Sequence, residues 1–571
     1  MSEALPTAPA EPVPAAAPTA RGGSAGRGAE PPGAPGRSGR RVARRAATVA
    51  AGLLVLVALV APDDLRDLSP LALARVPVEG LLAAAVLLII PPRATRASAT
   101  VAGALLGLLV VVRCLDTGFL VAFDRPFDPL ADWYFLGPAV EFVARSVGRP
   151  GAVAAAIVAV ALAAAVPVGL AWAAARLARV GSAHRARLAR TVAVLGVVWV
   201  AAAVVDARVG PDLPVAATEA AGVVSNQAGR VRAGLADRDA FAAQSRVDAY
   251  RYAAGSDLLT ALRGKDVVLA FVESYGRVAL DDPVVTAALD AGAARLRAAG
   301  LVARSAYVGS PTAGGASWLA HATLQSGLWV DSQRRYTDLV RTDRLTLSGA
   351  FRRAGWRTVA VAPANHGDWP EAGFYGFDRV YNAGDLGYEG PRFTFDSVPD
   401  QFTLSAFHRA ERVAIGRPPV MAELDLISSH APWSPVPPML DWSTLGDGAA
   451  YASVSGSRDI PESVLSRDTG RVRADYARSI AYSVHSLTDY AARYSGENLV
   501  MVFLGDHQPA PVVAGDGAPR EAPITIVARD PAVLDRITGW NWTDGLRPGP
   551  SAPVWRMDTV RDRFLAAFGG S

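Results

Sequence analysis

The sequence predicts a domain of five transmembrane helices followed by an α/β domain outside the membrane. Three observations carry this prediction: long apolar runs before residue 210, Arg clusters between those runs, and alternating strand and helix patterns after residue 265. A chain of 571 residues is also too long for one ordinary domain. Hydrophobic residues make up 51% of the sequence and charged residues only 19%, and the apolar excess lies almost entirely in the amino-terminal part.

The first 41 residues are rich in Ala, Pro, Gly and Ser and lack apolar periodicity, so we expect a disordered cytoplasmic tail over residues 1–41. The transmembrane domain is expected over residues 42–206. A spanning helix needs about 20 apolar residues, with roughly 17 to 25 tolerated. A buried core helix is the alternative for any one apolar run, but five in succession favour the membrane. The five segments are Ala46–Ala61, Leu71–Ile90, Ala97–Phe119, Gly151–Leu177 and Thr191–Val205.

The positions of the Arg residues orient this domain, because cytoplasmic loops carry an excess of positive charge. Arg clusters precede the first segment and fill the fourth loop, two Arg residues lie in the second loop, and the first loop is acidic. We therefore expect a multi-pass protein of the cell membrane with a cytoplasmic N-terminus and everything after Asp206 outside. The third loop, residues 124–149, is then also outside, and its Trp133 and Tyr134 suit the aromatic belt at a membrane surface.

The remaining chain divides into a linker and a second domain. Residues 207–263 are polar and rich in Ala and Arg, and we expect them to lift the next domain off the bilayer. Over residues 264–571 strands and helices alternate, which predicts an α/β sheet covered on both faces, with its ligand site beyond the carboxyl ends of the strands. The predicted strands are Asp266–Val272, Leu301–Tyr307, Thr358–Ala362, Val420–Ile427, Leu499–Leu504 and Ile524–Ala528. The predicted helices are Val284–Ala298, Trp318–Gln325, Thr346–Ala354, Phe402–Arg412, Asp475–Tyr494 and Asp558–Ala567.

Charge and cysteine content exclude several classes of function. The net charge is only +4, and the Arg residues form short clusters between apolar runs instead of one basic face, so nucleic-acid binding is not expected. The single cysteine, Cys114, excludes an intrachain disulfide framework and a Cys-rich metal site.

Polar residues at two strand ends predict a metal site. The first strand ends in Phe-Val-Glu273-Ser-Tyr-Gly, and the strand at Leu499 ends in Gly-Asp506-His507-Gln-Pro. Taken alone, Glu273 is read as a loop carboxylate and the Asp-His pair as a turn. Together on one rim they form an oxygen and nitrogen donor set suited to Mn, Zn or Mg.

A Gly pair at 314–315 precedes Ser317, where a helix begins, and such a helix start favours a phosphate-like charge. Ser317 is read either as the N-cap of that helix or as a metal-bound nucleophile, and Thr312 is the rival nucleophile in the same loop. His430 follows the strand Val420–Ile427. His residues on predicted helices, such as His321, are read as structural.

These residues resemble the sulfatase/alkaline-phosphatase superfamily, and within it the lipoteichoic acid synthase-like phosphoglycerol transferases. The resemblance covers five transmembrane helices, a linker and an extracytoplasmic α/β domain of alkaline-phosphatase/sulfatase type. It implies that Glu273, Asp506 and His507 bind the metal together with Ser317, that Ser317 is the nucleophile, and that His430 contacts the substrate. A further segment, His366-Gly-Asp368-Trp369, resembles the one that holds the glycerol headgroup.

The sequence departs from the family pattern at three points. Ser317 stands where the family usually has Thr, and an Arg expected after Trp369 is missing. The formylglycine motif of true sulfatases is also absent from the sequence that follows Ser317, which disfavours sulfate-ester hydrolysis.

The resemblance implies a metal-dependent enzyme that moves a phosphoglycerol-type headgroup from a membrane phospholipid to a glycan or polymer acceptor through a phospho-serine intermediate. One divalent metal is expected, manganese first, with magnesium or zinc as alternatives. Two other hypotheses stay open. One is a sulfatase-like phosphodiesterase or sulfuric ester hydrolase that uses water as acceptor, and the other is a non-catalytic envelope scaffold.

Overall fold

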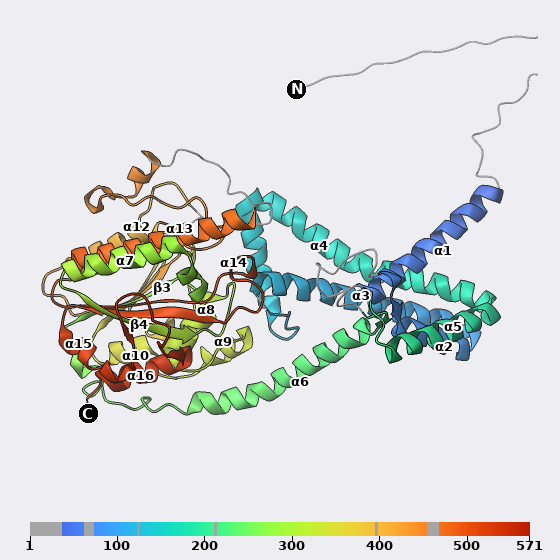
Figure 1. The fold of residues 1–571 in the computed structure, drawn as a ribbon, viewed down its shortest axis with the longest axis horizontal. Helices are drawn as coiled ribbons and strands as arrows, with labels where there is room; N and C mark the ends of the chain where they lie inside the picture. Colours follow the sequence, from blue (N-terminus) through green and yellow to red (C-terminus); the bar gives the residue numbers. More distant parts are fainter. Residues whose placement is uncertain are drawn as a thin grey trace, which may run out of the picture.

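The computed structural model describes residues 37–61, 73–123, 125–209, 214–393, 398–453 and 468–570. Most of the predicted disordered tail and the acidic first loop lie outside the described residues. Figure 1 shows a bundle of long helices at one end of the molecule and an α/β domain at the other.

Within the described residues, four helices are long and apolar enough to cross a membrane: Arg40–Val60 within α1 (Arg37–Val60), Arg93–Phe123 within α3 (Pro92–Phe123), Gly148–Ala183 within α4 (Leu136–Ala183), and α5 (Arg185–Val204). The second predicted segment forms only α2 (Val78–Ile89), whose 12 residues fall short of the roughly 17 that a span needs. The count of five spans is therefore not confirmed. The chain before α2 pairs as β1 (Val76–Pro77) with β2 (Ala216–Ala217), and Pro77 is the N-cap of the helix.

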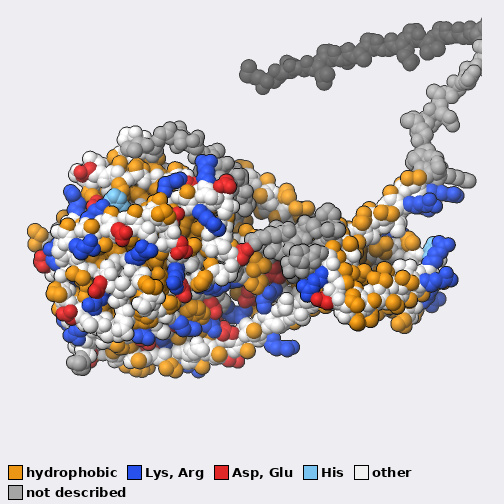
Figure 2. Space-filling model, viewed as in Figure 1, with side chains coloured by type: hydrophobic (Ala, Val, Ile, Leu, Met, Phe, Trp, Pro, Cys, Tyr) orange, Lys and Arg blue, Asp and Glu red, His pale blue; other side chains and the backbone are white. Residues whose placement is uncertain are grey.

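The predicted Arg clusters meet at one end of this bundle. Figure 2 shows apolar side chains over the helices and Lys and Arg side chains gathered at the end far from the α/β domain. Nη2 of Arg176, late in α4, donates to the carbonyl oxygen of Arg44 in the cluster that begins α1, and its Nε donates to Oγ1 of Thr48 one turn later at 3.2 Å. The cluster before the first span and the cluster between α4 and α5 thus lie on the same side, as the alternation of charges requires.

The predicted linker is largely one helix, α6 (Glu219–Arg246), which runs between the bundle and the α/β domain (Figure 1). At its start, Glu219 pairs with Arg75, and near its middle Arg230 pairs with Asp116 of α3 at 3.0 Å. In its second half, Asp237 accepts a hydrogen bond from Nε of Arg335 in the α/β domain at 2.8 Å. Charged contacts therefore attach the first half of α6 to the bundle and its second half to the α/β domain.

A mixed sheet of nine strands organises the α/β domain, in the order β10-β4-β9-β8-β3-β7-β5-β6 with β11 beside β4. The strands are β3 (Asp266–Val272), β4 (Val302–Gly309), β5 (Arg357–Ala362), β6 (Arg379–Asn382), β7 (Val420–Leu426), β8 (Leu499–Gly505), β9 (Glu521–Ala528), β10 (Thr543–Asp544) and β11 (Val554–Arg556). All six predicted strands are present. The strands from β8 to β6 run parallel, whereas β9 is antiparallel to both β8 and β4.

Helices cover both faces of this sheet, as the sequence predicts. Successive β3 side chains point to opposite faces: Val268 lies in a core with α7, α12 and α13, and Val267 in a second core with α8, α10 and α16. These helices are α7 (Pro283–Ala298), α8 (Ser317–Ser326), α10 (Leu347–Arg353), α12 (Asp400–Phe407), α13 (Thr469–Tyr494) and α16 (Val560–Phe568). Shorter helices complete the domain: α9 (Gln333–Leu339), α11 (Ala372–Tyr375), α14 (Pro511–Ala514) and α15 (Pro531–Asp535).

The register of the parallel strands aligns the loops that carry the predicted chemistry. Val272, the last residue of β3, lies opposite Gly505 of β8 on one side and Leu426 of β7 on the other. The loops after these three central strands therefore begin at the same edge of the sheet.

Candidate metal and nucleophile site

Four predicted site residues meet at this edge. Oγ of Ser317 donates to Oε2 of Glu273 at 2.9 Å and lies 3.2 Å from Nε2 of His507. That Nε2 atom is also 3.5 Å from Oε1 of Glu273 and 3.5 Å from Oδ2 of Asp506. One donor atom from each of Glu273, Asp506 and His507 lies within 4.8 Å of the other two, and all three residues are buried.

Hydrogen bonds behind the cluster fix the orientation of these side chains. Oδ1 of Asp506 accepts from the backbone N–H groups of Ser274 and His507, each at 2.7 Å. Nδ1 of His507 lies 2.8 Å from the carbonyl oxygen of Gln508, which makes Nδ1 the protonated nitrogen and leaves the Nε2 lone pair facing the cluster. Two carboxylates, an unprotonated imidazole nitrogen and a hydroxyl form a donor set that fits one divalent cation.

The pKa values of Glu273 and Asp506 are shifted in opposite directions. Burial alone would raise the pKa of Glu273, but the imidazoles of His507 and His430 when protonated, and the hydrogen bonds from Ser274 and Ser317, lower it to about 2. Burial and the neighbouring charge of Glu273 raise the pKa of Asp506 to about 6. Glu273 is therefore the carboxylate that stays ionised as the pH falls.

The structure separates the two interpretations of Ser317. The N-cap of α8 is Ala316, whose backbone is left-handed with a φ of 61°, and Ser317 is the first helical residue. The interpretation of Ser317 as the cap is wrong, because its hydroxyl turns to Glu273 instead. The rival Thr312 donates its hydroxyl to the carbonyl oxygen of Gly315 at 2.7 Å, which engages it within the loop.

The predicted substrate-binding residues lie along the same edge. His430 follows β7, its Nδ1 is 2.7 Å from the carbonyl oxygen of Ala431, and its charge contributes to the lowered pKa of Glu273. His366, Asp368 and Trp369 follow β5, one strand further along the sheet. His366 and Asp368 are exposed, whereas Trp369 is half-buried with its ring 5.1 Å from that of Tyr375.

A second cluster of ionisable side chains, which was not predicted from the sequence, lies between α8 and β7. Nδ1 of His321 is 3.4 Å from Oε1 of Glu423 and 3.5 Å from Oδ1 of Asp425, and its ring stacks on Phe271 at 3.8 Å. Burial lowers the pKa of His321, but Asp425 and Glu423 together raise it to about 9, so the imidazolium balances the carboxylates. The available signal was the alternation of Glu423 and Asp425 in an otherwise apolar strand, which directs both to one face.

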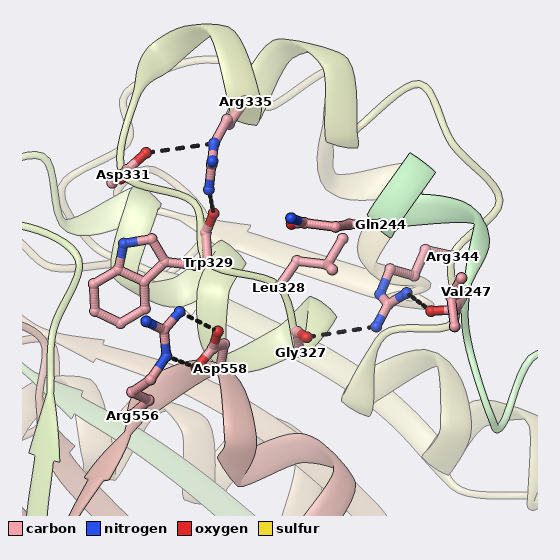
Figure 3. Close-up of a pocket in the computed structure, with 10 residues that line it drawn as sticks. All are labelled: Gln244, Val247, Gly327, Leu328, Trp329, Asp331, Arg335, Arg344, Arg556 and Asp558. Carbon is pink, nitrogen blue, oxygen red and sulfur yellow. Dashed lines mark hydrogen bonds and ion pairs between the residues drawn. The ribbon is translucent and has the colours of Figure 1, made fainter. Parts of the chain in front are cut away.

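A separate cavity of about 630 Å³ lies at the opposite end of α8, next to Gly327 (Figure 3). Two of its Arg side chains have acidic partners: Arg556 pairs with Asp558 at 2.8 Å and Arg335 with Asp331 at 3.6 Å. The third, Arg344, donates to the backbone carbonyls of Ser326, Val247 and Gly327. Because Ser317 stands at the other end of α8, we do not assign the cavity to the reaction site.

No protein family description and no curated protein sequence matches this chain. Solved structures do match. The integral membrane lipooligosaccharide phosphoethanolamine transferase A from Neisseria meningitidis aligns over 92% of this chain and 95% of its own, with 13% identity and a TM-score of 0.42. The lipoteichoic acid synthase LtaP from Listeria monocytogenes aligns over 55% of this chain and 74% of its own, with 14% identity and a TM-score of 0.35. The phosphoglycerol transferase GacH from Streptococcus pyogenes aligns over 58% of this chain and 91% of its own, with 12% identity and a TM-score of 0.35.

Proposed function

We propose that this protein transfers a phosphoglycerol-type headgroup from a membrane phospholipid to a glycan or polymer acceptor through a phospho-serine intermediate. One observation carries the proposal: the hydroxyl of Ser317, at the start of α8, lies 2.9 Å from Oε2 of Glu273 and 3.2 Å from Nε2 of His507. A hydroxyl beside a carboxylate and an imidazole at a helix N-terminus is suited to attack an anionic phosphoester.

Glu273, Asp506 and His507, together with the hydroxyl of Ser317, would hold one divalent cation, with manganese preferred over magnesium or zinc. When bound, such a cation supplies a positive charge that lowers the pKa of a nearby hydroxyl. Nδ1 of His507 keeps its proton on the Gln508 carbonyl, so Nε2 stays a donor atom throughout.

The reaction proceeds in two displacements. Oγ of Ser317 attacks the phosphorus of the donor lipid, a new phosphorus–oxygen bond forms, and diacylglycerol leaves with a proton on its alcohol oxygen. The free N–H groups of the first turn of α8 favour negative charge at this point, and His430 steadies charge on the phosphoryl oxygens. An acceptor hydroxyl then attacks the same phosphorus and releases Ser317.

The proposed arrangement in the membrane rests on the Arg clusters and on the path of α2. Although α2 is short, the Leu88 carbonyl in its last turn accepts from Arg185 at the start of α5, so α2 returns the chain to the Arg-rich end of the bundle. With those clusters in the cytoplasm, the α/β domain lies outside the cell membrane, where phospholipid donors and envelope acceptors are both present. His366, Asp368 and Trp369 at the end of β5 are the proposed contacts to the headgroup.

The test uses the full chain, manganese and vesicles that contain phosphatidylglycerol. Replacing Ser317 with Ala should reduce release of diacylglycerol by about a thousandfold or more, because a covalent nucleophile acts as part of a unit. Ser317→Thr, which keeps a hydroxyl, should retain turnover. The matched control is Ser332→Ala, since Ser332 also begins a helix but caps it by accepting from the Arg335 N–H at 3.3 Å.

Product analysis separates the alternatives. A phosphorylated Ser317 peptide found by mass spectrometry, and product that grows with added glycan, support the transferase. Free glycerol phosphate at an unchanged rate with and without glycan identifies water as the acceptor. Full turnover by Ser317→Ala overturns the nucleophile assignment.

A further inference from the structure

The nucleophile loop packs directly against the end of a membrane-spanning helix. A Cβ added at Gly315 would lie 3.2 Å from the ring of Phe123, and one at Gly314 would lie 2.7 Å from the carbonyl oxygen of Ala122. Ala122 and Phe123 are the last residues of the span Arg93–Phe123 in α3. Figure 1 shows α3 extending from the bundle to the α/β domain. The two glycines thus allow a transmembrane helix to approach the loop that presents Ser317.

Aromatic contacts from the next segment reinforce this approach. Trp318, adjacent to the nucleophile, has its ring 5.6 Å from that of Phe135 and 6.4 Å from that of Tyr134. Both partners belong to the short helix η3 (Asp132–Phe135), which lies in the chain between two spans. Asp128, just before η3, pairs with Arg334 of the α/β domain at 3.0 Å.

The same segment exposes a group of large apolar side chains, which we call the η3 surface: Leu130, Trp133, Tyr134 and Leu136. Trp133 and Tyr134 are 55% and 53% exposed, and the two leucines are 46% and 55% exposed. Trp and Tyr are the residues that gather where a membrane meets water. The ring of Phe135 in η3 lies 5.5 Å from that of Phe119 and 5.0 Å from that of Phe123, both in the last turns of the span in α3, so the η3 surface adjoins the end of that span and reaches Trp318.

We infer that the η3 surface is the entry site for the donor phospholipid, and this inference rests on the function proposed above. The glycerol backbone and upper acyl chains would lie on Trp133 and Tyr134 while the phosphate reaches Ser317 beyond Trp318. The occupant is a lipid because the surface is apolar and is continuous with helices that can cross a membrane. A phospholipid bound there keeps its tails at bilayer level while its phosphate lies at the nucleophile.

The test compares two substrates on the full-length protein. One is phosphatidylglycerol in vesicles, and the other is bis-p-nitrophenyl phosphate, a soluble phosphodiester without acyl chains. The double variant Trp133→Ala, Tyr134→Ala should lower kcat/KM for the vesicles about tenfold or more, the effect of losing the apolar contacts of two aromatic side chains, and leave the soluble substrate within about twofold. The controls are Trp172→Ala on α4 and Tyr252→Ala before β3, residues that are 49% and 88% exposed.

Each outcome bears on the inference. Selective loss with vesicles, absent from both controls, supports lipid entry at the η3 surface. Equal loss on both substrates shows that the segment only supports the nucleophile loop and overturns the inference, as does unchanged activity on vesicles. A matching loss in the controls also overturns it, since any exposed aromatic would then act alike. If the wild-type protein cleaves neither substrate, the proposed function itself fails, which is a different result from failure of the entry site alone.

Discussion

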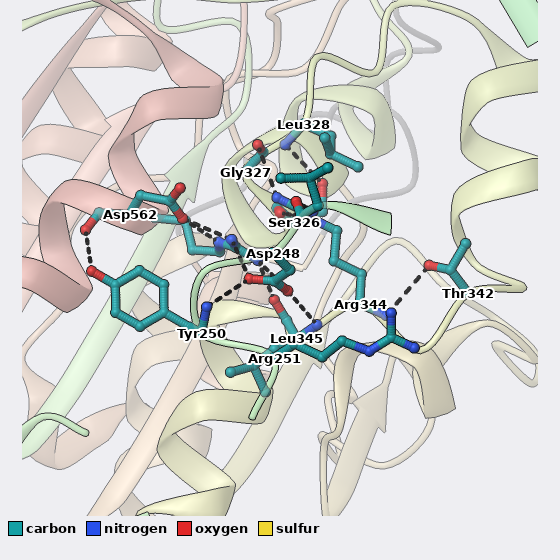
Figure 4. Close-up of polar contacts among 12 residues, drawn as sticks. Asp248, Tyr250, Arg251, Ser326, Gly327, Leu328, Thr342, Arg344, Leu345 and Asp562 are labelled. Carbon is teal, nitrogen blue, oxygen red and sulfur yellow. Dashed lines mark hydrogen bonds and ion pairs between the residues drawn. The ribbon is translucent and has the colours of Figure 1, made fainter. Parts of the chain in front are cut away.

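A buried ion pair between the end of the linker and the last helix offers a quantitative test of the structure. Asp248 lies between Tyr250, Leu345 and Asp562 (Figure 4). It accepts from Nη2 of Arg561 at 2.9 Å and from Nη1 at 3.3 Å, and the side chains of Asp248 and Arg561 are 1% and 0% exposed. The same guanidinium donates to the carbonyl of Leu345 at 2.5 Å and pairs with Asp562 at 2.7 Å. This network joins three parts of the chain: the segment after α6, which holds Asp248, the loop before α10, which holds Leu345, and helix α16, which holds Arg561.

Replacing Asp248 with Asn keeps the shape but removes the charge that Arg561 faces. Breaking one side of a buried pair costs about 3–5 kcal/mol, because the remaining charge stays desolvated. Asp562, 49% exposed, and the Leu345 carbonyl remain as partners, so we expect a loss near the lower end, about 3 kcal/mol in the free energy of unfolding of the α/β domain.

The assay is guanidinium chloride unfolding of the full chain in detergent, followed by tryptophan fluorescence. The matched control is Asp544→Asn, which removes the acidic partner of Arg304 at a site where the Asp is 85% exposed. An exposed pair contributes about 0–1 kcal/mol, so the control should move the midpoint little. Equal shifts of the unfolding midpoint in the two variants would show that the buried pair contributes no more to stability than the exposed pair, and would refute the reasoning.

The pH dependence of the same pair has a definite sign. Burial raises the pKa of Asp248, but Arg561 and its hydrogen bonds lower it below the ordinary value. A lowered folded-state pKa gives stability that is present above the unfolded pKa of about 3.9 and is lost as the pH falls further. The difference between wild type and Asp248→Asn should therefore shrink in acid below about pH 4.

Three further predictions concern the site. Because the pKa of Asp506 is raised to about 6, manganese must displace a proton from this carboxyl group when it binds in acid. Calorimetric titration should therefore show that the affinity of the protein for manganese falls about tenfold per pH unit below pH 6. Thr312→Val removes the hydrogen bond to Gly315 and should lower the free energy of unfolding by about 1 kcal/mol. Headgroup release should stay within about tenfold of wild type. A loss of activity of about a thousandfold, as expected when a nucleophile is missing, would contradict our choice of Ser317. His321→Leu leaves the buried carboxylate of Glu423 and the half-buried carboxylate of Asp425 without a cation and should destabilise the domain by about 3 kcal/mol in thermal or chemical unfolding. Adding Asp425→Asn should restore part of that loss, and additive effects would contradict the pairing.

Features set by local sequence could be predicted well. β3 is seven residues long and fully buried, and its predicted bounds agree with the structure because apolar residues run without interruption up to Glu273. The position of Glu273 at the sheet edge followed directly. β6, β10 and β11 were missed since strands of two to four residues contain too few side chains to show a periodic pattern.

Features set by distant contacts could not be predicted. Ser317 has the same sequence context as a cap or as a nucleophile, and only its distance to Glu273, 44 residues earlier, distinguishes them. α2 was expected to span because Leu71–Ile90 is apolar in composition, yet the chain around Val76 pairs instead with Ala216, far along the sequence. The antiparallel direction of β9 likewise depends on pairing with β8 and β4 across the fold.

The helical character of α6 has a further consequence for substrate encounter. At 1.5 Å per residue its 28 residues form a rod of about 42 Å, whereas a flexible chain of that length would sample a wide range of end-to-end distances. The first half of the rod is attached to the bundle through Arg230 and its second half to the α/β domain through Asp237, and Asp128 and Arg334 form a further attachment. Ser317 is thus confined to one level relative to the helix bundle. The effective concentration of that serine relative to lipid in its own leaflet is then set by the geometry of the protein, independently of protein concentration.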